Sequence, residues 1–248
     1  MNWLDAATDG PGPLVVVLPY AGAVRPPSAL VRTAADPGVT VAGVTYPGHG
    51  SAGGQLIDDA EELLDGMLSQ LMPLARPRLV LVGFSLGGNL AFELARRLTA
   101  AGRPPGGLVT CVARGPHTGV GHRPLSGLAR DEFVAEAVRL GLLTPAAASM
   151  DGMSGMIDAL RADLTIVERM PLHAAAPPLT GPAVVIGATG DWLVPDPSLR
   201  RWADVYAVAP LQLRIPGRHL TWVTEPGPMA AALARALRYV LPAADGAA

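Results

Sequence analysis

The sequence predicts an α/β fold built on a mostly parallel sheet flanked by helices. Short apolar runs rich in valine and leucine alternate with longer stretches whose apolar residues recur at helical spacing. Most of these runs end at glycine or proline, as at Pro19, Pro47, Gly83 and Pro216, where a strand gives way to a loop. The 248 residues suffice for one large domain of this kind with a well-buried core.

The expected elements follow the chain in alternation. Strands are expected at 14–18, 39–44, 79–82, 108–113, 183–187 and 211–215. Helices are expected at 28–35, 55–71, 88–101, 197–205 and 228–241. From about 117 to 180 the alternation stops, and only two amphipathic helical patterns occur, at 128–143 and 147–170. We therefore expect a single domain over residues 1–248, with residues 117–180 as a helical insertion within it.

The composition excludes several classes of protein. A net charge of −2 gives no electrostatic case for binding nucleic acid or an anionic membrane. No apolar run approaches the ~18 residues that span a membrane, and the stretch from Met1 to Asp5 lacks the basic residues of a secretory signal. The single cysteine, Cys111, fits a core thiol in a reducing cytoplasm. The histidines are too scattered to hold a metal. We expect a cytoplasmic protein with neither metal nor cofactor.

One motif carries most of the chemical information. Gly83-Phe84-Ser85-Leu86-Gly87 lies between the apolar run that ends at Val82 and a helical stretch. A Gly-x-Ser-x-Gly in this context is the nucleophile elbow of an α/β-hydrolase, in which a sharp, strained turn exposes the serine oxygen at the carboxyl end of the sheet. Hydrolases of this fold carry a helical lid where the insertion at 117–180 lies. The motif therefore predicts the α/β-hydrolase fold with Ser85 as nucleophile.

A serine nucleophile needs a base, and the base needs an acid that orients it. In this fold the chain order is Ser, then Asp or Glu, then His. Asp191 follows the late strand at 183–187, and His219 follows the last strand. Asp196 lies in the same loop as Asp191 and is the alternative acid, although its place before Pro197 suits a helix cap better.

Backbone N–H groups are expected to stabilise the negative charge that develops on the substrate oxygen. Leu86 opens the elbow helix, so its N–H is one expected donor. The N–H of Ala21, in the loop after the first strand, is the other. Pro19 in that loop has no N–H to offer.

Several stretches together resemble the type II thioesterases that accompany polyketide and nonribosomal peptide assembly lines. These stretches are Pro19-Tyr20-Ala21-Gly22, Tyr46-Pro47-Gly48, Ala91-Phe92-Glu93-Leu94-Ala95, Asp131-Glu132-Phe133-Val134, Leu140-Gly141 and Leu160-Arg161-Ala162-Asp163-Leu164. They span nearly the whole chain in that family's order, and those in the insertion are the most discriminating. The chain departs from the family pattern at Phe84, where histidine is usual, at Ala23, where glycine is usual, and at His49-Gly50, where Arg and an acid are common.

The resemblance implies hydrolysis of acyl groups from the phosphopantetheine thiol of an acyl or peptidyl carrier protein. It carries over Ser85 as nucleophile, Asp191 as acid and His219 as base.

Four side chains are candidates for the substrate pocket: Tyr20, Phe84, Met153 and Met156. The methionines recur at helical spacing, so they are candidates either for a pliable acyl-binding wall or for packing the insertion onto the domain.

Other functions remain open from the residues alone. A carboxylesterase or lipase uses the same three residues, and so does an acyltransferase or cyclase that passes the acyl group to an amine, hydroxyl or thiol. A binding module on the same scaffold usually lacks one of the three. Asp163 is expected to pair with Arg161 or a helix neighbour.

Overall fold

The computed structural model describes residues 3–5, 12–75, 78–150, 153–172 and 177–241. At its centre lies a six-stranded sheet in the order β2-β1-β3-β4-β5-β6, in which every neighbouring pair is parallel. The strands are β1 (Leu14–Leu18), β2 (Thr40–Gly43), β3 (Leu79–Phe84), β4 (Gly107–Cys111), β5 (Ala183–Ala188) and β6 (Leu211–Ile215). All six predicted strands are present, and the predicted α/β fold with a parallel sheet is confirmed.

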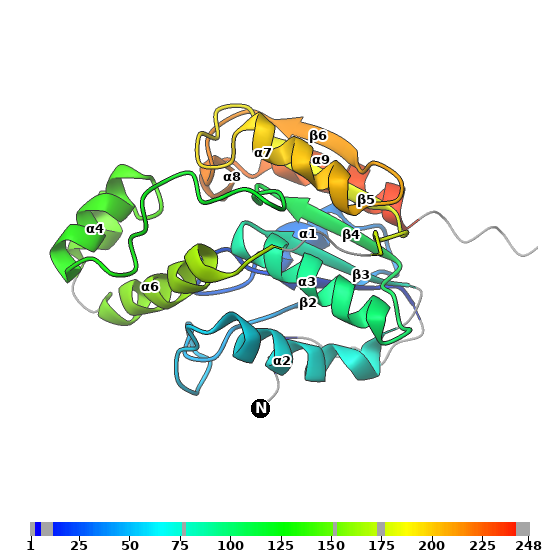
Figure 1. Ribbon diagram of the computed structural model, residues 1–248, viewed down its shortest axis with the longest axis horizontal. Helices are drawn as coiled ribbons and strands as arrows, with labels where there is room; N and C mark the ends of the chain where they lie inside the picture. The colour runs from blue at the N-terminus through cyan, green and yellow to red at the C-terminus, as the bar shows by residue number, and fades with distance from the viewer. Residues whose placement is uncertain (1–2, 6–11, 76–77, 151–152, 173–176, 242–248) are drawn as a thin grey trace, which may run out of the picture.

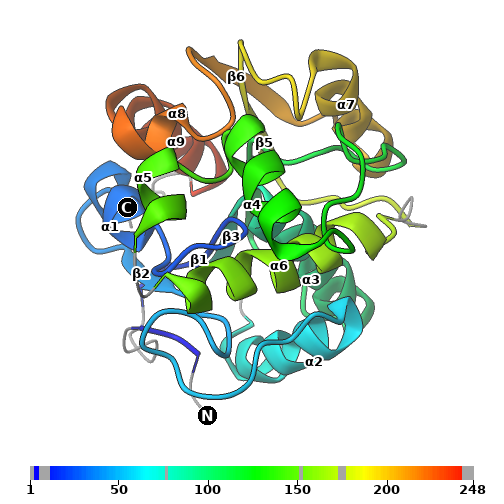
Figure 2. The same ribbon diagram turned by 90° about the vertical axis from the view of Figure 1, so that its left-hand side faces the viewer.

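Helices cover both faces of this sheet (Figures 1 and 2). One face packs against α1 (Ser28–Ala34) and α9 (Gly227–Val240), and the other against α2 (Ala60–Leu71) and α3 (Leu86–Ala100). The remaining helices outside the insertion are short: α7 (Asp196–Arg200), α8 (Thr221–Thr224) and the 3₁₀ turns η1 (Met72–Leu74) and η2 (Arg201–Val205).

Alternation along the strands builds two separate cores. In β1, Leu14, Val16 and Leu18 face the core that contains α2 and α3. Val15 and Val17 face the core that contains α1 and α9. Because helices cover both faces of the sheet, every residue of β1 is apolar, and apolar and polar residues do not alternate along it. Burial in the second core also raises the pKa of the Cys111 thiol, in agreement with an inert core residue.

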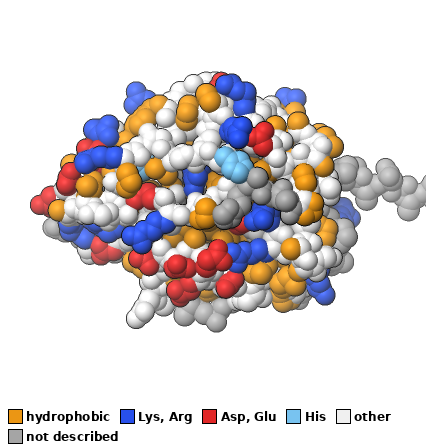
Figure 3. All heavy atoms as spheres, viewed as in Figure 1, with side chains coloured by type: hydrophobic (Ala, Val, Ile, Leu, Met, Phe, Trp, Pro, Cys, Tyr) orange, Lys and Arg blue, Asp and Glu red, His pale blue; other side chains and the backbone are white. Residues whose placement is uncertain are grey.

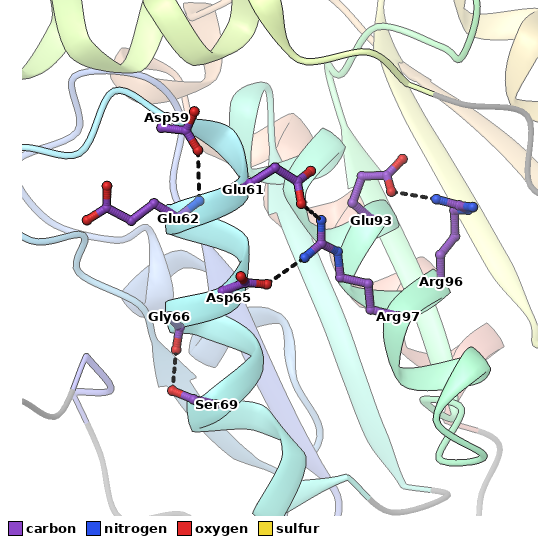
Figure 4. A network of polar contacts seen from close by, with 9 residues as sticks. All are labelled: Asp59, Glu61, Glu62, Asp65, Gly66, Ser69, Glu93, Arg96 and Arg97. Atoms are coloured by element: carbon purple, nitrogen blue, oxygen red, sulfur yellow. Dashed lines mark hydrogen bonds and ion pairs between the residues drawn. The ribbon is translucent and has the colours of Figure 1, made fainter.

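Capping explains where α2 begins. The sequence predicted a helix over 55–71, whereas α2 starts at Ala60. Asp59 takes the N-cap position, where its carboxylate accepts a hydrogen bond from the N–H of Glu62 at 2.9 Å (Figure 4). A side chain that satisfies a free helical N–H fixes the first turn, and the residues before it remain outside the helix.

Surface ion pairs join neighbouring helices without deciding the fold. Arg97 of α3 pairs with Glu61 of α2 at 2.6 Å and with Asp65 at 2.8 Å (Figure 4). Arginine and acidic side chains also lie side by side over the face seen in Figure 3. Exposed pairs of this kind contribute about 0–1 kcal/mol each. Burial of apolar side chains between helices and sheet is therefore the larger stabilising effect.

Among the described residues between β4 and β5 there are three helices, α4 (Arg130–Arg139), α5 (Pro145–Ser149) and α6 (Ser154–Arg169). They lie together at one end of the molecule (Figures 1 and 2). The helix predicted over 147–170 is thus two helices. Thr144 caps α5 through the N–H of Ala147, and Met150 has the extended backbone that ends it. No helix in the described parts of the chain is long and apolar enough to cross a membrane.

The central strand supplies a prediction about stability. Val82 in β3 is fully buried, so Val82→Ala removes buried methyl groups and leaves a cavity. We expect a loss of about 2 kcal/mol in the free energy of unfolding, measured by urea denaturation. Val208→Ala is the matched control, because Val208 is 74% exposed. Equal effects of the two substitutions would contradict the assignment of Val82 to the core.

Candidate active site

The turn between β3 and α3 holds Ser85 in a strained conformation. Its φ of 49° and ψ of −114° lie outside the regions that L-residues ordinarily occupy. The strain is imposed by close backbone packing on both sides. A Cβ on Gly83 would overlap the carbonyl of Gly87, and a Cβ on Gly87 would overlap the carbonyl of Leu18. Only glycine allows strand and helix to approach this closely.

Ser85, His219 and Asp191 form one hydrogen-bonded line. His219 Nε2 lies 2.9 Å from Ser85 Oγ, and His219 Nδ1 lies 2.7 Å from Asp191 Oδ2. Because a carboxylate only accepts, Nδ1 carries the proton and Nε2 is free to accept the hydroxyl proton of Ser85. The arrangement can thus generate a serine nucleophile and stabilise the imidazolium that forms.

Backbone hydrogen bonds in two loops hold the acid and the base in position. The other carboxylate oxygen of Asp191 accepts hydrogen bonds from the N–H groups of Leu193 at 3.0 Å and Val194 at 3.1 Å. The N–H of Gly190 donates to the carbonyl of Gly217 at 2.8 Å, which joins the loop after β5 to the loop after β6. Backbone contacts therefore fix the acid independently of its bond to the histidine.

A tryptophan that sequence reasoning missed also anchors the base. Trp222 Nε1 donates to the carbonyl of His219 at 3.0 Å, and its ring packs edge-on against Tyr20 at 5.4 Å between centroids. The only sign of this contact in the sequence is that Trp222 follows His219 by three residues.

Asp196 takes neither of its predicted roles. It is the first residue of α7, and the cap position belongs to Pro195. Its carboxylate is 59% exposed and pairs with Arg214 at 3.0 Å. Asp191, by contrast, is 5% exposed and contacts the histidine directly. The structure thus brings Asp191, not Asp196, to His219.

Two backbone donors lie beside the serine. As the first residue of α3, Leu86 has no preceding helical turn whose carbonyl its N–H could reach. Across the described chain, the N–H of Ala21 donates to no backbone carbonyl. Both residues line a cavity of about 50 Å³ together with Ser85, which we call the small cavity. The assignment of these two N–H groups to an oxyanion hole stays a prediction.

A second, larger cavity of about 410 Å³ lies between the insertion and the loops at His219. We call it the large cavity, and Leu142, Met156 and Leu160 line it from the insertion. Ala21, Leu142 and His219 border both cavities, so the two spaces meet at the hydrogen-bonded line. Leu142 was not singled out from the sequence, because only the fold brings it to the site.

The predicted pocket residues divide into two groups. Tyr20 and Met156 line the large cavity. Phe84 and Met153 line neither cavity. Alternation along β3 points the Phe84 side chain into the core beneath α1 and α9, where its ring lies 4.7 Å from that of Trp222 between centroids. Its contact with the elbow is therefore structural packing.

Two histidines outside the hydrogen-bonded line, His49 and His122, make separate contacts. His49 contacts Asp163 and the carbonyl of Pro47, and His122 contacts the carbonyl of Arg123. No group of histidine, cysteine and acidic residues in the described ranges could hold a metal ion.

A serine, histidine and aspartate in line, at a strand–turn–helix of a parallel sheet, define a serine hydrolase of the α/β-hydrolase fold. The model of the Thioesterase domain family matches residues 13–242, and the chain belongs to that family. The predicted resemblance to type II thioesterases is confirmed.

The individual proteins to which the chain is similar are also thioesterases. RedJ, the thioesterase from the prodiginine biosynthetic pathway in Streptomyces coelicolor, is 27% identical, with a TM-score of 0.78 over 91% of this chain and 85% of that one. The probable cadicidin biosynthesis thioesterase of Streptomyces griseus is 29% identical over 206 residues, 81% of this chain. The chain spans about half of that relative, 55% of its length. YbtT, a type II thioesterase from the yersiniabactin pathway, shares the fold at 22% identity, with a TM-score of 0.77 over 96% of this chain and 99% of that one.

The two acids of the loop after β5 provide a test of the site. Asp191→Asn should slow labelling of Ser85 by a fluorophosphonate by about 10³–10⁴-fold, because the amide favours the wrong tautomer of His219. Asp196→Asn is the matched control and should label at the wild-type rate, since its carboxylate contacts Arg214 instead. The reverse order of rates would make Asp196 the acid.

Proposed function

We propose that the protein hydrolyses acyl thioesters carried on the phosphopantetheine thiol of an acyl or peptidyl carrier protein, through an acyl-Ser85 intermediate. The observation that carries the proposal is the 2.9 Å contact of Ser85 Oγ with His219 Nε2 at the junction of the two cavities, in a chain of the thioesterase family. The two cavities, of about 410 and 50 Å³, share Ala21 and His219 and offer space for an acyl group beside the reacting atoms.

In the proposed reaction, His219 takes the proton of Ser85 as the serine oxygen attacks the thioester carbon. The N–H groups of Ala21 and Leu86 stabilise the oxyanion, and removing one such donor typically costs about 3 kcal/mol. Asp191 stabilises the imidazolium. The C–S bond then breaks and His219 returns its proton to the leaving thiolate, which makes the imidazole neutral again. His219 next takes a proton from a water that attacks the acyl-Ser85 ester, and it gives this proton to the Ser85 oxygen as the acid leaves.

The insertion is proposed to act as a lid over the acyl group. Leu142, Met156 and Leu160 give the large cavity an apolar wall on the side of α4 to α6. An apolar cover limits the access of bulk water to the acyl-enzyme. RedJ has a structure with a PEG molecule bound in its active site, which supports room for an extended chain in this fold.

The setting proposed for this activity is polyketide or nonribosomal peptide biosynthesis, as editing or product release. Support comes from the named pathways of the relatives, which include prodiginine and cadicidin biosynthesis. In that setting the partner is a carrier protein with a bound acyl group.

Substitution of the nucleophile tests the function directly. Ser85→Ala should lower release of acyl groups from an acylated carrier protein by at least about 10³-fold, followed by intact-mass spectrometry of the carrier. Ser69→Ala is the matched control, because Ser69 lies on the exposed side of α2 and its hydroxyl only donates to the carbonyl of Gly66.

Two outcomes would replace the proposal. Unchanged turnover in Ser85→Ala would remove Ser85 as the nucleophile. Preference of the wild-type chain for free p-nitrophenyl esters over carrier-bound thioesters would make it a carboxylesterase, and acyl transfer to an added amine or alcohol would make it a transferase or cyclase.

A further inference from the structure

A buried polar cluster outside the hydrogen-bonded line joins the insertion to the loop that carries Ala21. It consists of His49 in the loop after β2, Asp163 on α6 and the N–H of Gly22 in the loop after β1. The side chains of His49 and Asp163 are only 3% and 1% exposed. In Figure 2, α6 passes across the ends of β1 and β2, where these two loops begin.

The partner of Asp163 differs from the one expected from the sequence. Arg161 lies over the ring of Phe133 at 4.3 Å and donates to the carbonyls of Ser126 and Leu128. The expected pairing of Asp163 with Arg161 or a helix neighbour is therefore wrong. The helix turns the Asp163 carboxylate toward His49 instead.

The contacts of His49 define its charge. Nε2 lies 3.0 Å from Asp163 Oδ2, and Nδ1 lies 3.1 Å from the carbonyl oxygen of Pro47. Both partners only accept hydrogen bonds, whereas a neutral imidazole has a single N–H to donate. Both contacts are satisfied only when both ring nitrogens carry a proton. The geometry is therefore that of an imidazolium beside a carboxylate.

Asp163 depends on that charge. Its Oδ2 accepts from His49 and also from the N–H of Gly22 at 2.7 Å. Its Oδ1 is buried and has no hydrogen-bond partner in the described chain. A carboxylate removed from water in this way is costly unless an opposite charge lies beside it, and His49 provides that charge.

Gly22 connects Asp163 to the loop that carries Ala21. It follows Ala21 directly, has a φ of 74°, and packs so closely under α6 that a Cβ would lie 3.0 Å from the Leu160 side chain. The hydrogen bond to Asp163 limits rotation of the peptide that joins Ala21 to Gly22. At the other end of the loop, the Tyr46 hydroxyl donates to the carbonyl of Pro19 at 3.1 Å.

We propose that His49 and Asp163 are positioning residues that hold the Ala21 N–H in the oxyanion hole, and that this support requires a protonated His49. The inference rests on the proposed function, because it assigns a role to the loop that would stabilise the oxyanion. It makes the rate of the reaction depend on a titratable pair that never touches the substrate.

The surroundings of His49 set the direction of the pH dependence. Burial alone lowers the pKa of His49, but its hydrogen bond to Asp163, the charge of Asp163 and the Pro47 carbonyl outweigh burial and raise the pKa above its ordinary 6.5. Asp163 on α6 is the charged group that shifts it, and Tyr46 on its own loop presents a ring edge-on at 5.6 Å between centroids.

Because the pKa is higher in the folded chain than in the unfolded one, the stabilisation is complete below pH 6.5 and is lost as pH rises through the folded value. The rate constant kcat should therefore fall on the alkaline side with the deprotonation of His49.

The experiment compares kcat and KM across pH for the wild-type chain, Asp163→Asn, His49→Gln and Asp158→Asn. Asp158 provides the matched control, because it lies on the same helix and its exposed carboxylate pairs with Arg130. Asp163→Asn should lower kcat at neutral pH by about 10–100-fold, less than loss of the oxyanion donor itself, with KM changed less than about threefold. It should also lose the alkaline fall of kcat.

A folded Asp163→Asn whose kcat and pH profile match those of Asp158→Asn would overturn the proposal. If the variants do not fold, nitrogen NMR of the wild-type His49 ring decides. Two protonated nitrogens at about pH 7.5, where an imidazole of ordinary pKa is mostly neutral, support the proposal, and a neutral ring overturns it. The labelling rate of Ser85 by a fluorophosphonate gives the same comparison without a carrier protein. Failure of the carrier reaction alone would therefore reject the proposed function and leave this inference testable.

Discussion

The close approach of strand β3 and helix α3 is the constraint on which the rest of the site depends. Gly83 and Gly87 bring backbone against backbone, and the turn between them leaves Ser85 with a positive φ. That strain is sustained because β3 is central, with β1 and β4 paired on either side of it and helices over both faces. A less constrained turn would relax, and the serine oxygen would no longer meet His219.

The parallel sheet gathers the remaining groups without further specialisation. Its strands all end at the same edge, so the loops after β1, β3, β5 and β6 bring Ala21, Ser85, Asp191 and His219 to one place. Hydrogen bonds between loops then hold these groups in place, as the contact of Gly190 after β5 with Gly217 after β6 illustrates. The precision of the site comes from these loop contacts, and its location comes from the topology.

The insertion does more than cover this edge. Through Asp163 it reaches the loop of Ala21, and through Leu142 it borders both cavities. The position of α6 is thus coupled to the conformation of the loop that carries Ala21 and Gly22.

The sequence by itself determined the strands, the elbow at Ser85 and the base His219, because apolar runs, Gly-x-Ser-x-Gly and chain order are local or ordered features. It left Asp191 and Asp196 as alternative acids, and the structure brings Asp191 to His219. Tertiary structure alone decided the rest. Phe84 faces the core rather than the pocket through strand alternation, and Asp163 meets His49, 114 positions away, rather than Arg161. Such contacts depend on which faces of helices and strands pack against each other, and the spacing of residues along the chain does not predict them.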